Sequence, residues 1–196
     1  MEEHNHEEAD TLIVHQVLTS VSQGGLYHID VWSPDTDVLI LLLDLVANKH
    51  IQRPNQLNFI TGKGVTYKKI DVVERVQVIG VSKCQGLIGL HNFSGADWGG
   101  KFVGITKKRW TNSYIKLSEN HPTINAFQNL GTQRIPNELI NGELPAGLNA
   151  FENFVCHMYS ATGQTTLPQL RWELFRSKNR EGEMLPPTRA ELFPHI

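Results

Sequence analysis

A strand pattern, an acidic turn and an apolar run follow one another in residues 27–47, YHIDVWSPDTDVLILLLDLVA. Tyr27 to Trp32 predicts a strand, and Ser33-Pro34 ends it. Val38 to Ala47 is apolar nearly all round; its ten-residue length favours a buried helix over another strand, and Asp35 or Thr36 can cap that helix. Strand, acidic turn and buried helix are half of a βαβ unit, so the predicted fold class is α/β.

The rest of the chain predicts a small α/β core followed by a helical second half. Asp10 to Ser22 favours a helix, and Leu57–Thr61 and Val65–Ile70 favour two strands joined by a hairpin at Gly62-Lys63-Gly64. Further helices are expected at residues 72–79, 83–93, 102–117, 124–130, 148–159 and 167–176. A soft domain boundary near Pro122 separates an α/β core, 7–121, from a helical C-terminal extension, 122–196.

Composition is that of an ordinary globular protein. Net charge is -2, so nucleic-acid binding needs a local basic patch. No apolar run reaches membrane-spanning length and no signal peptide precedes the acidic N-terminus, so we expect no membrane partner. The two cysteines, Cys84 and Cys156, are too few for a disulfide scaffold, which favours an intracellular location, nuclear or cytoplasmic. Oligomeric state is not predicted.

Three acidic clusters lie far apart in the sequence: Glu7-Glu8-Ala9-Asp10, Asp35-Thr36-Asp37 and Ser94-Gly95-Ala96-Asp97. Asp35 and Asp37 follow the carboxyl end of a predicted strand, where α/β sheets bind ligands. Gathered carboxylates repel one another unless a cation compensates them. Convergence of the clusters therefore predicts a site for Mg²⁺ or Mn²⁺ that acts on phosphate esters.

Each acidic cluster also has a purely structural interpretation. Asp35 is a good helix N-cap, and Ser-Pro-Asp is a common turn. Asp97 lies in a glycine-rich stretch typical of a surface turn. Glu7, Glu8 and Asp10 favour a helix N-terminus through the helix dipole.

A basic segment, Gly104-Ile105-Thr106-Lys107-Lys108-Arg109, precedes a predicted helix. Backbone N–H groups at a helix start and three cations would hold a phosphate, which predicts nucleic-acid binding at Gly104, Thr106, Lys107, Lys108 and Arg109. The alternative is a solvated basic face. Trp98 and Trp110 would stack on bases or pack in the core, and core packing is the better expectation for each.

The ordered motifs Glu7-Glu8-Ala9-Asp10-Thr11, Ser33-Pro34-Asp35-Thr36-Asp37-Val38 and His91-x-x-Ser94-Gly95-x-Asp97 resemble an uncharacterised animal family. That family is often transposon-associated and carries a Gly-Cys-Asp-Thr-Thr motif. Later segments at residues 154–156, 170–175 and 185–188 also match its pattern, so the resemblance runs from Glu7 to Ile196.

The same acidic order is similar to the PIN-like nucleases of the flap-endonuclease superfamily. The resemblance implies a parallel-sheet core in which Glu8 and Asp10 (with Glu7 as an alternative), Asp35, Asp37 and Asp97 converge on two divalent metals. Asp35, Asp37 and Asp97 would be the catalytic residues. Residues 104–109 would stand where flap endonucleases grip the DNA backbone with a helix–hairpin–helix.

Two departures from these patterns qualify the expectation. Ala96-Asp97-Trp98-Gly99-Gly100 stands where the animal family has Cys-Asp-Thr-Thr-Ser, and a PIN-like fold begins with an Asp-bearing strand that should precede Glu7. The family pattern also continues beyond His195-Ile196. We therefore expect an N-terminally incomplete sheet, in a truncated product or a partial gene model.

Three functions follow from this sequence. The first is a metal-dependent nuclease of DNA or RNA. The second is a non-catalytic nucleic-acid or protein-binding module derived from a mobile element. A phosphatase-like hydrolase that uses Asp35 and Asp37 is the third and ranks last, because no suitable lysine context accompanies them.

Overall fold

The computed structural model describes residues 9–49, 51–95, 102–132, 146–159, 163–178 and 182–192. The chain forms two compact units, Met1–Gln85 and Gly86–Ile196, and each is described by itself. Pro122, where the sequence suggested a soft boundary, is the first residue of a helix inside the second unit.

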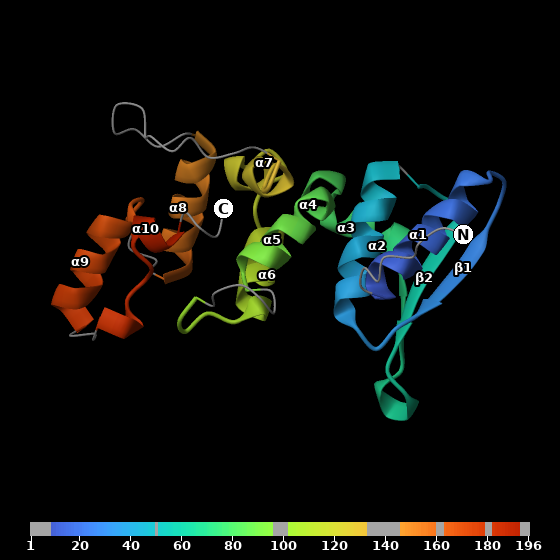
Figure 1. The fold of residues 1–196 in the computed structure, drawn as a ribbon, viewed down its shortest axis with the longest axis horizontal. Helices are drawn as coiled ribbons and strands as arrows, with labels where there is room; N and C mark the ends of the chain where they lie inside the picture. The colour runs from blue at the N-terminus through green and yellow to red at the C-terminus, as the bar shows by residue number, and fades with distance from the viewer. Residues whose placement is uncertain are drawn as a thin grey trace, which may run out of the picture. The chain divides into compact units, whose positions relative to one another are not determined.

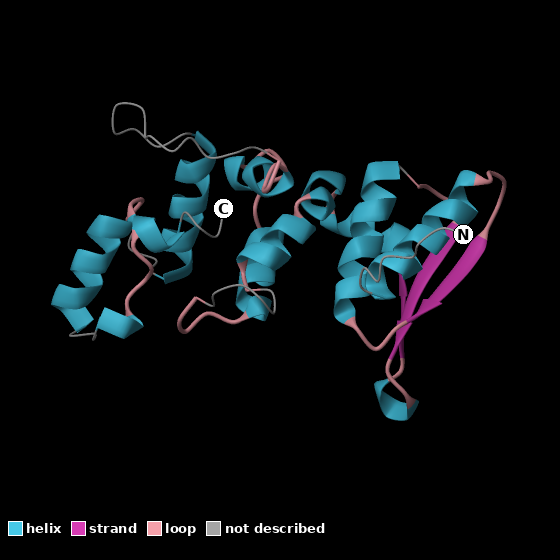
Figure 2. Ribbon diagram, viewed as in Figure 1, coloured by secondary structure: helices cyan, strands magenta, loops and turns pink. Residues whose placement is uncertain are grey.

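The described part of the first unit combines helices with a small sheet (Figures 1 and 2). In chain order its elements are α1 (Ala9–Ser22), β1 (His28–Trp32), α2 (Thr36–Lys49), β2 (Gln56–Thr61), the short 3₁₀ helix η1 (Gly64–Thr66), β3 (Lys68–Asp71), α3 (Val72–Ile79) and α4 (Val81–Gln85). The α/β class predicted from residues 27–47 is confirmed.

The sheet is small and mixed, with strand order β1-β2-β3. β1 and β2 are parallel, with Asp30 opposite Asn58 and Trp32 opposite Ile60. β2 and β3 are antiparallel, with Ile60 opposite Lys69. The predicted hairpin is therefore present, whereas an all-parallel core is not: the connection from β2 to β3 is too short for the crossover that a parallel strand needs.

The central strand β2 is buried on both faces of the sheet, from Leu57 to Ile60, whereas β1 buries Val31 between exposed neighbours. Val31, Leu57 and Phe59 are buried on one face of the sheet, and α3 packs against β2. α2 contacts α1, α3 and α4, which explains why its sequence is apolar nearly all round: a helix with neighbours on several sides buries most of its circumference.

The second unit is helical, as the sequence predicts. Its elements are α5 (Leu87–Phe93), α6 (Lys107–Ile115), α7 (Pro122–Gln128), α8 (Ala146–Tyr159), α9 (Leu167–Lys178), the 3₁₀ helix η3 (Gly182–Met184) and α10 (Arg189–Leu192). Its core is aromatic: Phe93, Trp110, Phe127, Phe151 and Phe154 meet at ring-centroid distances between 4.9 and 5.8 Å. Trp110 is thus a core residue, and Trp98 lies outside the described residues.

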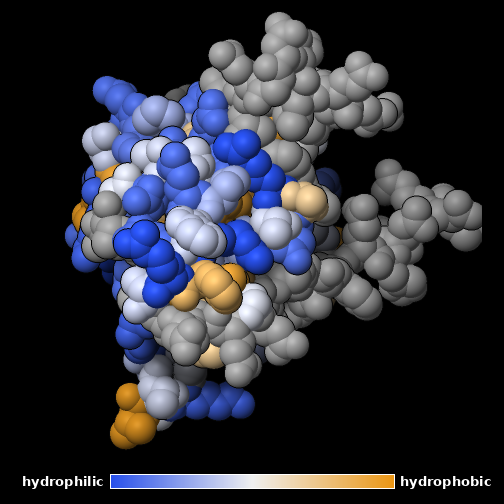
Figure 3. Space-filling model, turned by 90° about the vertical axis from the view of Figure 1, so that its left-hand side faces the viewer, coloured by the Kyte–Doolittle hydropathy of each residue, from blue (hydrophilic) through white to orange (hydrophobic). Residues whose placement is uncertain are grey.

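In the part of the chain that the structure describes, every helix is too short or too polar to cross a membrane. The face drawn in Figure 3 is largely hydrophilic, and its hydrophobic residues form small, separate patches.

Candidate functional site

The turn between β1 and α2 holds two of the predicted site residues. Asp35 directly precedes α2, and its Oδ1 accepts a hydrogen bond from the Asp37 backbone N–H at 2.9 Å. The Asp35 backbone N–H donates to Ser33 Oγ at 3.0 Å. The structural interpretation of Asp35 as a helix cap is therefore correct. Capping engages Oδ1, and a carboxylate has a second oxygen with which to accept other ligands.

The fold brings Asp10 to this turn. Asp10 lies in the first turn of α1, which packs against α2. Its pKa is raised above the ordinary value, first because burial removes solvent from the carboxylate, and second because the negative charges of Asp35 and Asp37 act on it. The packing of α1 on α2 therefore lets the charges of three carboxylates from two predicted clusters act on one another.

The remaining predicted ligands, Glu7, Glu8 and Asp97, lie outside the described residues. Within residues 9–49, 51–95 and the other described ranges, no group of three or more His, Cys, Asp or Glu side chains is arranged to hold a metal ion. The charges of Asp35 and Asp37 act on Asp10. The three carboxylates are nevertheless not arranged as a ready-made coordination sphere.

Substituting Asp10 with asparagine is expected to raise the melting temperature of the metal-free protein at pH 7. The raised pKa means that the ionised Asp10 carboxylate destabilises the fold above its folded pKa, and this penalty disappears as pH falls below the unfolded value of 3.8. The expected rise is ~2 °C in low salt, because the site is partly exposed and screened. Thermal denaturation at pH 7 and at pH 3.5 measures it.

The control for this variant is Glu74→Gln. Glu74 also occupies the first turn of a helix, α3, so both variants lose the favourable interaction with the helix dipole. Only Asp10→Asn also removes repulsion from Asp35 and Asp37. An equal loss of stability in both variants would show that the three carboxylates do not interact.

The basic segment has structural roles in the second unit. Thr106 caps α6 by accepting a hydrogen bond from the Arg109 backbone N–H, and Gly104 adopts a positive φ of 74°. The Arg109 guanidinium donates to the Met158 carbonyl oxygen at 2.6 Å and so joins α6 to α8. Lys107 Nζ lies 3.3 Å from His91 Nε2, and Lys108 is exposed. The predicted phosphate contacts of Arg109 and Lys107 therefore compete with contacts inside the protein.

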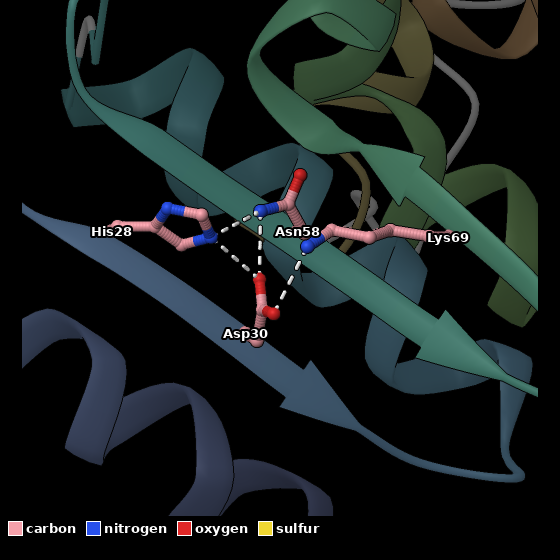
Figure 4. Close-up of polar contacts among 4 residues, drawn as sticks. All are labelled: His28, Asp30, Asn58 and Lys69. Carbon is pink, nitrogen blue, oxygen red and sulfur yellow. Dashed lines mark hydrogen bonds and ion pairs between the residues drawn. The ribbon is translucent and has the colours of Figure 1, made fainter.

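A polar network on the sheet was not predicted from the sequence (Figure 4). Asp30 Oδ1 accepts from Asn58 Nδ2 at 2.8 Å and lies 3.1 Å from His28 Nε2, while Lys69 Nζ donates to Asp30 Oδ2 at 3.0 Å. The strand register explains why these side chains lie together. Asp30 on β1 is opposite Asn58 on β2, and Lys69 on β3 is opposite Ile60 on β2. Asn58 and Ile60 are two residues apart and therefore lie on the same face of β2. The polar–apolar alternation of residues 28–31 was the available signal.

Replacing Asp30 with asparagine is expected to destabilise the protein at pH 7 and to have no effect in acid. Lys69, then Asn58, hold the pKa of Asp30 below its ordinary value by hydrogen bonding to the carboxylate. The stabilisation is therefore present above the unfolded pKa of 3.8 and is lost as pH falls through the lower folded pKa. Urea unfolding of both proteins across this pH range measures the effect. A stability difference independent of pH would contradict the role of this charge.

Family models, curated proteins and solved structures contain no match to this chain.

Proposed function

We propose that this chain is a PIN-like nuclease domain that hydrolyses phosphodiester bonds of DNA or RNA and depends on Mg²⁺ or Mn²⁺. The observation that carries the proposal is the electrostatic coupling of Asp10 to Asp35 and Asp37 at the carboxyl end of β1. Three neighbouring carboxylates are unfavourable without a compensating cation.

The donor set fits a hard divalent cation. Carboxylate oxygens are the ligands that Mg²⁺ and Mn²⁺ prefer, and sites for these ions commonly combine a few carboxylates with water and substrate phosphate. Asp10, Asp35 and Asp37 would hold the metal, with Glu8 and Asp97 as further proposed ligands. A bound divalent ion supplies an activated water and stabilises the oxygen that leaves the phosphate.

The protein's own residues would orient this chemistry. The bond from the Asp37 N–H to Asp35 Oδ1 fixes the Asp35 carboxylate at the start of α2, and the N-terminus of that helix favours the negative charge of both Asp35 and a phosphate. The packing of α1 on α2 holds Asp10 nearby. We place such an enzyme in the nucleus or cytoplasm, where its two buried cysteines, Cys84 and Cys156, would stay reduced.

A cleavage assay on the purified chain tests the proposal. End-labelled single-stranded and flap oligonucleotides are incubated with Mg²⁺, Mn²⁺ or EDTA, and the melting temperature is recorded under the same conditions. We expect cleavage and a raised melting temperature with either metal and neither with EDTA. The absence of both effects would exclude a metal-dependent nuclease.

A non-catalytic nucleic-acid-binding module is the second candidate. It is favoured by the helix-capping role of Asp35, which requires no metal, and by the absence of a ready-made metal cluster in the described residues. This function predicts binding of nucleic acid in EDTA without cleavage on addition of metal, so the same assay distinguishes the two candidates.

A further inference from the structure

Two aromatic side chains are exposed together at one end of the sheet. Trp32, the last residue of β1, is 64% exposed, and Tyr67, just before β3, is 48% exposed. Their ring centroids are 6.0 Å apart with planes tilted by 54°. Large aromatic side chains usually bury their area, so an exposed pair indicates a surface that something covers.

The segment that carries Tyr67 is basic. Residues 62–69, GKGVTYKK, contain three lysines and no acidic residue. Lys63 and Lys68 are exposed, whereas Lys69 pairs with Asp30. Val65, within η1 between β2 and β3, is fully exposed. We call Trp32, Tyr67, Lys63 and Lys68 the aromatic–basic platform.

We infer that this platform binds single-stranded nucleic acid. Unstacked bases present flat faces to exposed aromatic rings, and the phosphates between them are attracted by neighbouring lysines. A duplex has its bases stacked internally and would engage only the lysines. Charge complementarity thus favours a polyanion over an uncharged partner, and the exposed ring faces favour single strands among polyanions.

The platform and the acidic turn are close in the sequence. Trp32 is the last residue of β1 and precedes Asp35 by three residues. We infer that a single strand stacked on Trp32 is held near the turn that carries Asp35 and Asp37. This inference rests on the proposed function and narrows its substrate: the nucleic acid that reaches the cleavage site would be single-stranded. The acidic turn itself repels phosphate without metal, so binding in EDTA isolates the contribution of the platform.

Fluorescence anisotropy in EDTA tests the inference with a labelled 15-nucleotide oligothymidylate and a 15-base-pair duplex. We expect tighter binding of the single strand and about tenfold weaker binding by Trp32→Ala, from the loss of one stacked base. Lys68→Ala is expected to weaken binding and to reduce its salt dependence. The control is Trp172→Ala, which removes an equally exposed tryptophan (63%) from α9 in the other unit and should change nothing.

Equal affinities of Trp32→Ala, Trp172→Ala and the unsubstituted protein would overturn the inference, as would equal binding of single strand and duplex. The inference would also be overturned if the protein bound no oligonucleotide but self-associated, and if Trp32→Ala abolished that self-association. The platform would then bind a second copy of the chain.

The nuclease proposal fails separately: Trp32-dependent binding without metal-dependent cleavage refutes the enzyme and leaves the platform intact. Cleavage that Trp32→Ala leaves unaltered in both KM and kcat refutes the platform alone.

Discussion

Replacing Asp35 with asparagine is expected to lower metal-dependent cleavage of a single-stranded substrate by at least ~10³-fold. A metal ion contributes several kcal/mol to stabilisation of the transition state in phosphodiester hydrolysis, and each 1.4 kcal/mol is a factor of ten in rate. Removing the charge of one ligand would displace the ion or lower its affinity. The loss is measured as kcat/KM under saturating Mn²⁺, with the metal affinity determined in parallel by titration.

Asparagine is the appropriate substitution because it separates charge from capping. Asp35 Oδ1 accepts a hydrogen bond from the Asp37 backbone N–H, and asparagine retains an oxygen there and is an equally good N-cap. The stability of α2 should therefore be preserved. Asp71→Asn is the control for capping: Asp71 Oδ1 caps α3 by accepting from the Glu74 N–H at 3.0 Å, and its Oδ2 pairs with the Arg53 guanidinium.

Cleavage should be unchanged in Asp71→Asn. If Asp35→Asn cleaves as fast as the unsubstituted protein, the Asp35 carboxylate has only its capping role and the proposed metal site is refuted. If both variants lose activity together with thermal stability, the effect comes from the caps rather than from metal ligation, and that result also contradicts the proposal.

Arg189→Ala is expected to destabilise the second unit by about 3–5 kcal/mol. Glu152, on α8, is only 1% exposed, and Arg189 from α10 donates to both of its carboxylate oxygens, at 2.7 and 2.9 Å. Without Arg189, a buried carboxylate loses its counter-charge. Burial, followed by the negative charge of Glu152, raises the pKa of the neighbouring Cys156 thiol to about 12, so the local environment already disfavours negative charge. Urea unfolding at pH 7 measures the loss.

A rescue variant distinguishes charge burial from lost packing. Glu152 Oε1 also accepts a hydrogen bond from the Leu167 backbone N–H at 2.8 Å. Glu152→Gln combined with Arg189→Ala removes the buried charge and keeps an acceptor for that N–H, so it should recover much of the stability. Arg176→Ala, an exposed arginine on α9, should change stability by less than ~0.5 kcal/mol. A double variant no more stable than Arg189→Ala would show that packing of the arginine stem, not charge, is decisive.

Sequence patterns were sufficient where the interactions are local. Residues 27–47 predicted β1, the acidic turn and α2 because strand alternation, proline and helix capping act over a few neighbouring residues. The two-strand hairpin was also predicted, although its second strand begins later, at Lys68, because residues 64–66 form η1 instead of extending it. The predicted helix at 83–93 is divided into α4 and α5, with Gly86 between them.

The candidate site was predictable only in part. Asp35 and Asp37 were recognisable because they lie at the end of a predicted strand. The proximity of Asp10 was a hypothesis from motif order, since nothing local to α1 specifies which helix it packs against. Arg109 was expected to bind phosphate, but it donates a hydrogen bond to Met158, 49 residues away. The sequence could not predict this contact, because a long cationic side chain can either extend into solvent or donate to a nearby helix end.

The amino-acid order by itself determined the α/β class, the acidic turn after β1 and the helical second half, since these depend on backbone propensities and on the spacing of apolar residues. Tertiary structure alone decided which side chains interact: Asp10 with the charges of Asp35 and Asp37, Asp30 with Lys69, and Glu152 with Arg189. Such meetings join residues between 25 and 39 positions apart in the sequence. Their energies depend on burial and distance after the chain has folded, and neither quantity is encoded in any short segment.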